Sequence, residues 1–254
     1  MKIICVIPVR YGSTRFPGKP LADLAGKPLI RHVVERAQKA RRISGVVVAT
    51  DDRRIAAVFK GNENGVCVEM TRADHASGTD RIAEVLGRRQ ADVVINLQGD
   101  EPLMDPGLID RLAELFEKDP ALEMATAKVR IRDEATLNDP NCVKVFTDKQ
   151  GYATRFARIL DASDQRPATS DKPYKHLGIY GYGREFLLRF SKWQVTDSER
   201  RERLEQLRAL EHGVRIKVIE AEHDSIGVDT PEDLEKVRNL MAKSSRSTQQ
   251  SSQL

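Results

Sequence analysis

The sequence is poor in the features that mark disulfide-rich, zinc-binding and membrane proteins. Its 254 residues include only three cysteines, Cys5, Cys67 and Cys142, which lie far apart and form no CxxC pair. A disulfide scaffold or a zinc site is therefore not expected. No apolar run is long enough for a transmembrane helix, and the apolar start lacks the length and cleavage pattern of a signal peptide. We expect a cytoplasmic protein with no membrane partner.

Aromatic residues and excess charge are also scarce. Aromatic side chains make up 5% of the chain, and the net charge is only +4 because acids and bases are interleaved. No basic face rich in aromatic residues is present, so a nucleic-acid partner is not expected. Neither a GxxxxGK[ST] run nor a GxGxxG fingerprint occurs, which excludes a P-loop protein and the usual dinucleotide fold.

The remaining composition, 40% hydrophobic and 31% charged, is that of an ordinary globular α/β protein. The first half alternates short apolar runs with helical periodicity, which predicts a mostly parallel sheet with helices on both faces. The expected strands are 3–8, 45–49, 66–69 and 92–96, and the expected helices are 28–40, 52–60, 79–89 and 106–118.

The pattern changes after residue 123. Segments 124–131, 143–146, 152–156 and 177–182 resemble strands with few helices between them, which predicts antiparallel strands or a small subdomain within about 124–212. We expect a flexible loop or lid at 161–173, helices at 198–211 and 231–242, and a strand at 215–219. A single domain would then cover 1–241, followed by a disordered tail at 242–254.

The richest segment follows the first strand. Arg10, Arg15 and Lys19 lie there among hydroxyls, prolines and the glycines Gly12 and Gly18. Loops at the carboxyl ends of buried parallel strands are where open α/β sheets bind ligands. Three cations with close backbone approach suit a polyanion such as a nucleoside triphosphate, although a solvated basic turn is the alternative.

Three further segments hold candidate site residues. In 71–81, a run rich in hydroxyls and glycine leads into a helix and offers backbone donors to an anion, or simply caps the helix. Asp100 follows the strand 92–96 and could hold Mg²⁺, or belong to an ordinary Asp-Glu-Pro turn. Asp229 precedes the helix start at 230–233 and could supply a second metal carboxylate.

Together these segments resemble one family. Residues 10–21 match R-x-G-S-x-R-x-P-G-K-P-L, typical of nucleotidyltransferases that activate acidic sugars. With 71–81, 98–102, 176–182, 204–208 and 227–233, the chain closely resembles the 3-deoxy-manno-octulosonate cytidylyltransferase (CMP-Kdo synthetase) family over residues 2–240. The resemblance implies a Rossmann-like fold of the nucleotide-diphospho-sugar transferase type, with a smaller antiparallel subdomain.

The resemblance also implies a reaction and roles for individual residues. CTP and Kdo would give CMP-Kdo, for the lipopolysaccharide core, and pyrophosphate. Mg²⁺, as one ion or two, would be the cofactor, and a homodimer is expected with its interface at 183–192 or 124–146. The nucleotide-binding residues would be Arg10, Ser13, Arg15, Lys19, Thr71, Arg72, Ser77, Gly78 and Asp80. The catalytic residues would be Lys19, Arg15, Asp100 and Asp229, with both aspartates on the metal, and the sugar-binding residues Gln98, Arg158, His176, Tyr180, Glu205 and Gln206.

One departure from the family pattern lies beside the expected sugar pocket. Where relatives have a Ser-Arg-x-x-Ile-Pro run, this chain has Ala157 in place of the serine, and Ile159-Leu160-Asp161-Ala162 after Arg158, without proline. This leaves 8-amino-Kdo or another nonulosonate-like acid open as the sugar. A non-catalytic homologue that only binds CTP is the alternative from a different functional class.

Overall fold

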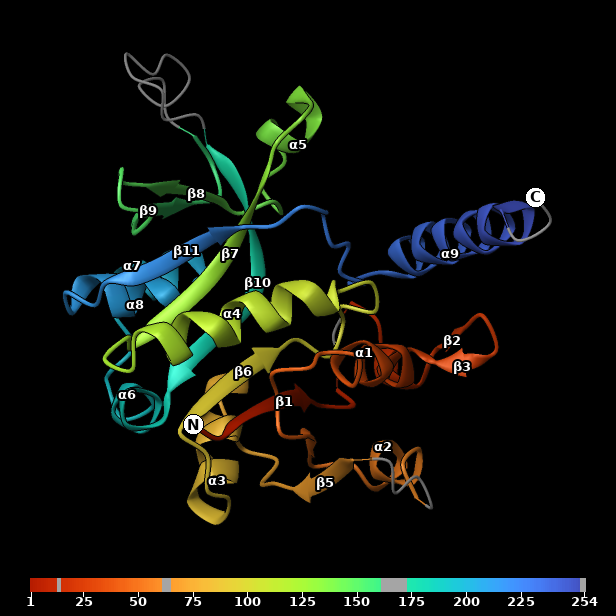
Figure 1. Ribbon diagram of the computed structural model, residues 1–254, viewed down its shortest axis with the longest axis horizontal. Helices are drawn as coiled ribbons and strands as arrows, with labels where there is room; N and C mark the ends of the chain where they lie inside the picture. The colour runs from red at the N-terminus through yellow and green to blue at the C-terminus, as the bar shows by residue number, and fades with distance from the viewer. Residues whose placement is uncertain (13–14, 61–64, 161–172, 252–254) are drawn as a thin grey trace.

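The computed structural model describes residues 1–12, 15–60, 65–160 and 173–251, with side chains as far as Lys243. Ser13 and nearly all of the expected lid at 161–173 lie outside these residues. In the described part of the chain, a nine-stranded sheet follows the order β11-β7-β10-β6-β1-β4-β5, and β8 and β9 extend from β10 (Figure 1). The main strands are β1 Ile3–Val9, β4 Val46–Thr50, β5 Val66–Met70, β6 Val93–Leu97, β7 Met124–Arg130, β10 Tyr174–Gly183 and β11 Ile216–Glu220.

Strand β1 is buried at every residue and lies near the middle of the sheet. Its side chains alternate: Ile3, Cys5, Ile7 and Val9 pack into one core, whereas Ile4 and Val6 pack into a second. The first core includes α1 (Leu29–Ala37) and α4 (Pro106–Lys118), and the second includes α3 (Gly78–Arg88) and α6 (Arg184–Phe190). This confirms the expected sheet with helices on both faces.

The antiparallel part is built into the sheet. Strand β10 lies between β6 and β7 and is antiparallel to both, while β11 is parallel to β7. Strands β8 (Lys144–Thr147) and β9 (Ala153–Ala157) form the small antiparallel extension. An irregularity in the β10–β7 pairing between Leu177 and Tyr180 falls where β10 passes the carboxyl end of β6. Two short strands, β2 (Asp23–Leu24) and β3 (Lys27–Pro28), form a separate hairpin.

Short helices connect the main elements in the described part of the chain. Asp52 caps α2 (Arg53–Ala57), and Asp133 caps α5 (Glu134–Asn138), which the sequence pattern did not predict. The expected helix 198–211 is wrong as a single element: α7 (Asp197–Glu202) and α8 (Gln206–Glu211) are separated at Arg203, which has a φ of 55°. This turn allows Leu204 to enter the second core.

The last helix, α9, extends over Pro231–Ser251 and leads away from the sheet (Figure 1). Leu234 and Val237 of its first turns are buried in the first core. The helix therefore continues to Ser251, through most of the segment for which the sequence predicts disorder. The tail contains neither glycine nor proline, so no residue in it ends a helix. Among the described helices, none is both long and apolar enough to cross a membrane.

Candidate active site

A cavity of about 630 Å³ lies at the carboxyl ends of β1 and β6. Four segments meet there: the end of β1 with the loop after it, residues 75–81, residues 98–100, and Asp229. The predicted site residues that line it are Arg10, Arg15, Lys19, Ser77, Gly78, Gln98, Asp100 and Asp229. The sheet therefore brings together residues that are far apart in the sequence, such as Lys19 and Asp229, which are separated by 210 positions.

Lys19 is the centre of a charged cluster in this cavity. Its Nζ donates to Asp100 Oδ2 at 2.7 Å and to Asp229 Oδ1 at 3.2 Å, and its side chain is only 13% exposed. Arg15 Nη2 lies 3.1 Å from the second Asp229 oxygen. Lys19 opens a short 3₁₀ turn behind Gly18, whose φ of 72° few other residues adopt. Two cations thus hold two carboxylates at one edge of the cavity.

These two carboxylates fit a Mg²⁺ ion. Mg²⁺ prefers oxygen ligands and is usually bound by one or two carboxylates together with water and substrate phosphates. The side chains of Asp100 and Asp229 are 31% and 47% exposed, so solvent and a substrate can reach both. Within the described residues, no group of three or more His, Cys, Asp or Glu forms a self-sufficient metal cage. This donor set therefore suits a metal that enters with a phosphate substrate.

Two loops approach the end of β1 closely because each presents a glycine. An alanine Cβ at Gly99 would lie 3.1 Å from Val9 Cβ, and one at Gly78 would lie 3.1 Å from Pro8 Cγ. Gly99 thereby brings Asp100 to the cavity, and Gly78 brings the N-terminus of α3. Gly78 is among the predicted site residues, whereas Gly99 is not. Its position between Gln98 and Asp100, directly after a buried strand, was the available signal.

The N-terminus of α3 is capped by its own side chains. Ser77 Oγ accepts from the Asp80 amide at 3.1 Å, and Asp80 Oδ2 accepts from the Ser77 amide at 3.1 Å, which forms a capping box. Asp80 does not line the main cavity. Its observed contact is therefore the helix cap, and a contact with nucleotide stays a prediction.

Glu205, expected in the sugar pocket, lies against this same helix end. It accepts hydrogen bonds from Thr79 Oγ1 at 2.7 Å, Ser77 Oγ at 3.2 Å and Arg208 Nη2 at 2.9 Å. Burial raises the pKa of the Glu205 carboxyl, and the Thr79 hydrogen bond and the Arg208 charge oppose the shift. One carboxylate thus links α3 with the start of α8.

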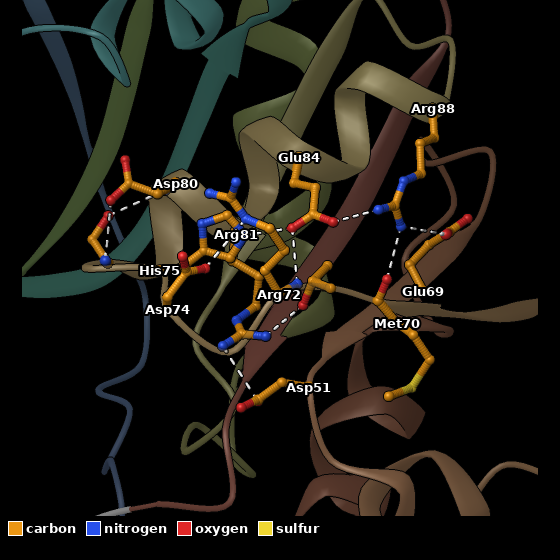
Figure 2. A network of polar contacts seen from close by, with 12 residues as sticks. Asp51, Glu69, Met70, Arg72, Asp74, His75, Asp80, Arg81, Glu84 and Arg88 are labelled. Carbon is orange, nitrogen blue, oxygen red and sulfur yellow. Dashed lines mark hydrogen bonds and ion pairs between the residues drawn. The ribbon is translucent and has the colours of Figure 1, made fainter.

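The segment between β5 and α3 contains a network of ion pairs (Figure 2). The His75 ring contacts Glu84 of α3, which also accepts from the Arg72 amide at 3.0 Å. The Arg72 side chain, 70% exposed, pairs with Asp74 and lines a second cavity of about 610 Å³ on the outer side of this segment. Arg72 is thus near the main cavity without lining it.

Arg81 is a cavity residue that the sequence analysis did not select. It is 4% exposed, it donates to Thr71 Oγ1, and its Nη2 lies 3.3 Å from Asp51 (Figure 2). Burial lowers the pKa of its guanidinium, and the Asp51 charge opposes that shift. Thr71 is itself buried and is held by Arg81, so its observed contact is structural.

The predicted sugar residues His176 and Tyr180 do not line the main cavity. His176 is buried, with Nε2 2.9 Å from Thr126 Oγ1 and its ring edge-on to Phe156, and burial lowers its pKa to about 3. Tyr180 lies beside it with a ring-centroid distance of 5.4 Å, and burial strongly raises the pKa of its hydroxyl. Of the six expected sugar residues, only Gln98 lines the main cavity.

Arg158 and Gln206 complete this group. Arg158 donates through Nε to the Glu202 carbonyl at 2.8 Å and through Nη1 to the Pro140 carbonyl at 3.3 Å. Gln206 is 4% exposed, and within the described part of the chain its Nε2 has no hydrogen-bond partner. A buried donor without a partner is costly, so a ligand acceptor there would be stabilising.

Comparison with known proteins decides the family. The family model described as cytidylyltransferase matches residues 4–216. A 3-deoxy-manno-octulosonate cytidylyltransferase from Geobacter sulfurreducens is 51% identical over 93% of this chain and 98% of its own length. This chain belongs to the 3-deoxy-manno-octulosonate cytidylyltransferases. A relative of the same name from Solibacter usitatus is 50% identical over 96% of both chains.

Solved structures agree with this family and with the fold. A structure of CMP:2-keto-3-deoxy-manno-octonic acid synthetase in complex with CTP is 42% identical, with a TM-score of 0.89 over 96% of this chain and all of that one. A glucose-1-phosphate thymidylyltransferase from Bacillus anthracis, 17% identical with a TM-score of 0.68 over 94% of both chains, shares the fold. This cytidylyltransferase therefore has the nucleotidyltransferase architecture expected from the sequence.

Proposed function

We propose that this cytidylyltransferase joins CTP to 3-deoxy-D-manno-octulosonate (Kdo), giving CMP-Kdo and pyrophosphate. The observation that carries the proposal is the cavity in which Arg10, Arg15 and Lys19 meet Asp100 and Asp229. Relatives about half identical over nearly the whole chain are 3-deoxy-manno-octulosonate cytidylyltransferases.

In this reaction the anomeric hydroxyl of the sugar attacks the α-phosphorus in line while pyrophosphate leaves. Little covalent chemistry falls to the protein, so positioning and charge neutralisation dominate. Arg10, Arg15 and Lys19 bind the triphosphate and neutralise the charge that develops on the leaving group. Asp100 and Asp229 would hold Mg²⁺, which lowers the pKa of the attacking hydroxyl and offsets phosphate charge when bound.

The sugar side is proposed from the family resemblance and from the contacts of these residues. Gln98 lines the cavity and packs 3.7 Å from the position of a Cβ on Gly178, in the irregular part of β10. His176 and Tyr180 flank that point, and the free Nε2 of Gln206 supplies a buried donor. Arg158 would supply the cation for the sugar carboxylate, and Glu205 would line the sugar pocket beside the N-terminus of α3.

Two alternatives remain for the test to decide. The departure at 157–162 leaves 8-amino-Kdo or another nonulosonate-like acid open as the sugar. The second alternative is a homologue that binds CTP without catalysing its turnover. The pairing of two carboxylates with Lys19 argues against this alternative, because a protein that only senses CTP has little need of a metal site.

The experiment is pyrophosphate release by purified protein with CTP and Mg²⁺, comparing Kdo, 8-amino-Kdo and a sialic acid. Pyrophosphate release with Kdo supports the proposal. Release with 8-amino-Kdo alone would show that 8-amino-Kdo is the substrate and would attribute the sugar specificity to the segment 157–162. Asp100→Asn should abolish release without changing the melting temperature. Asp197→Asn, at a side chain 96% exposed, is the matched control and should retain full activity. CTP binding without release for every sugar would overturn the proposal.

The biological setting is also proposed. CMP-Kdo of this kind serves synthesis of the lipopolysaccharide core, and we place the reaction in the cytoplasm and in a homodimer. Of the apolar residues in the expected interface 183–192, Phe186, Leu187 and Phe190 are buried within the chain's own second core, whereas Leu188 is partly buried against it. Light scattering on the purified protein tests the dimer.

A further inference from the structure

The candidate metal carboxylates lie on two segments that are tied to each other. Asp100 belongs to the loop 98–101, and Asp229 ends the segment 224–229, which we call the strap. The Val228 amide donates to the Asp100 carbonyl at 2.9 Å. This bond joins the loop and the strap one residue before Asp229.

Glu101 provides a second tie. Ser225 Oγ of the strap donates to Glu101 Oε2, and Ser225 is 4% exposed. Gly227 packs directly on the same carboxyl: a Cβ there would lie 3.3 Å from Glu101 Oε1. The carboxyl group of Glu101 thus contacts the strap at two points, and both lie within four residues of Asp229.

Strand β10 fixes the other end of the strap. Lys175 Nζ donates to Asp224 Oδ1 at 2.7 Å and to the Ser225 carbonyl at 3.1 Å. Ser225 is therefore held through its side chain by the loop and through its carbonyl by the sheet. The position of Ser225 relative to Asp100 is therefore set by Glu101 on one side and by Lys175 on the other.

We propose that Glu101 and Ser225 are positioning residues for the metal site: their hydrogen bond sets the separation of Asp100 and Asp229. The need for such a tie is electrostatic. Two carboxylates that share one cation repel each other, and Lys19 and Arg15 hold them only from the cavity side. The Glu101–Ser225 bond holds the same two segments from the opposite side. This inference rests on the proposed function, because it concerns the proposed Mg²⁺ ligands.

Ser225→Ala tests the proposal because it removes the hydroxyl and little volume. Mn²⁺ is the probe, and its binding to the full-length protein is measured by electron paramagnetic resonance, with and without CTP. Loss of a group that orients metal ligands commonly weakens metal binding by ten- to a hundred-fold. We expect Ser225→Ala to raise the Mn²⁺ dissociation constant about tenfold, which is the lower end of that range because the group acts through the backbone.

A matched control and a second variant separate positioning from general stability. Thr136→Ala removes a 3.0 Å hydroxyl–carboxylate bond in α5, which does not line the cavity, and should leave Mn²⁺ binding unchanged. Glu101→Gln keeps the shape of the side chain and retains an oxygen that can accept from the Ser225 hydroxyl. The Glu101→Gln protein should therefore bind Mn²⁺ more tightly than the Ser225→Ala protein. The KM for CTP with Mg²⁺ should rise in Ser225→Ala, while the KM for the sugar stays constant.

The outcomes distinguish the two claims. If wild-type protein binds Mn²⁺ and Ser225→Ala binds it equally well, the positioning proposal is overturned and the proposed function stands. If wild-type protein binds no Mn²⁺ even with CTP, the metal site in the proposed function fails, and the positioning proposal fails with it. If Ser225→Ala weakens binding and Thr136→Ala does not, the proposal is supported.

Discussion

Replacing Gly181 with alanine should destabilise this protein by overpacking its core. Gly181 lies in β10, paired with Ile95 of β6 and Ala125 of β7. An added Cβ would lie 2.5 Å from Cε2 and 3.1 Å from Cζ of Phe116, and 3.4 Å from Ile95 Cδ1. Phe116 is 1% exposed, so its ring cannot move aside into solvent.

The size of the effect follows from that geometry. Overpacking a filled core costs typically about 1–3 kcal/mol, and a contact this short belongs at the upper end. For a chain of this length, 1 kcal/mol shifts the melting temperature by roughly 2–4 °C. Gly181→Ala should therefore melt about 6–12 °C below the wild type in differential scanning calorimetry.

Gly87→Ala is the matched control. Gly87 lies in α3, where an added Cβ would meet nothing within 4 Å, and alanine is the better helix former by up to about 1 kcal/mol. Its melting temperature should equal or exceed that of the wild type. A Gly181→Ala protein that melts within about 2 °C of the wild type would show that the β10–α4 contact yields easily, and the reasoning would be refuted.

Three further predictions follow. Lys19→Met removes the ammonium between the two aspartates and should lower kcat/KM for pyrophosphate release about 100-fold or more. As a control, Lys27→Met breaks a surface ion pair with a glutamate and should leave kcat/KM unchanged. Burial lowers the pKa of His176 from 6.5 to about 3, so between these values the unfolded chain binds a proton that the folded chain does not. As the pH falls from 6.5 to 5, this group should thus lower the free energy of unfolding of the wild type by about 2 kcal/mol. Urea unfolding of His176→Gln over the same pH range should not show this loss. Lys144 is fully buried and donates to two backbone carbonyls, at 2.6 and 2.9 Å, so Lys144→Met should lower the urea midpoint by the equivalent of about 2–4 kcal/mol; an unchanged midpoint would contradict it.

The parallel half of the fold could be predicted because its signals are local. Apolar runs such as 3–8 and 92–96, separated by helical periodicity, predict strands whose carboxyl ends share one edge of the sheet. The convergence of Arg10, Lys19 and Asp100 follows from that alone. Asp229 was a candidate metal carboxylate from its place before the helix start at 230–233, but nothing near it in the sequence shows that its segment returns to the edge.

The other half depends on contacts that no short segment contains. Glu205 bonds Thr79 across 126 positions, and only the folded sheet places α8 against α3. The break at Arg203 was missed because a non-glycine residue with positive φ leaves no mark in a helical pattern. The continuation of α9 was missed for the opposite reason: polar composition was interpreted as disorder, although it contains no helix breaker.

The place of β10 between β6 and β7 has a consequence for the order in which this chain can be made. Both neighbouring strands leave the ribosome well before Tyr174, so a nascent chain exposes the edges of β6 and β7 that pair with β10 until Gly183 has emerged. Unpaired edges are templates for association with other chains. Fragments that stop before β10 should therefore aggregate even though they contain β1 and the loop that follows it. The shortest soluble fragment made by truncation from the C-terminus must retain β10.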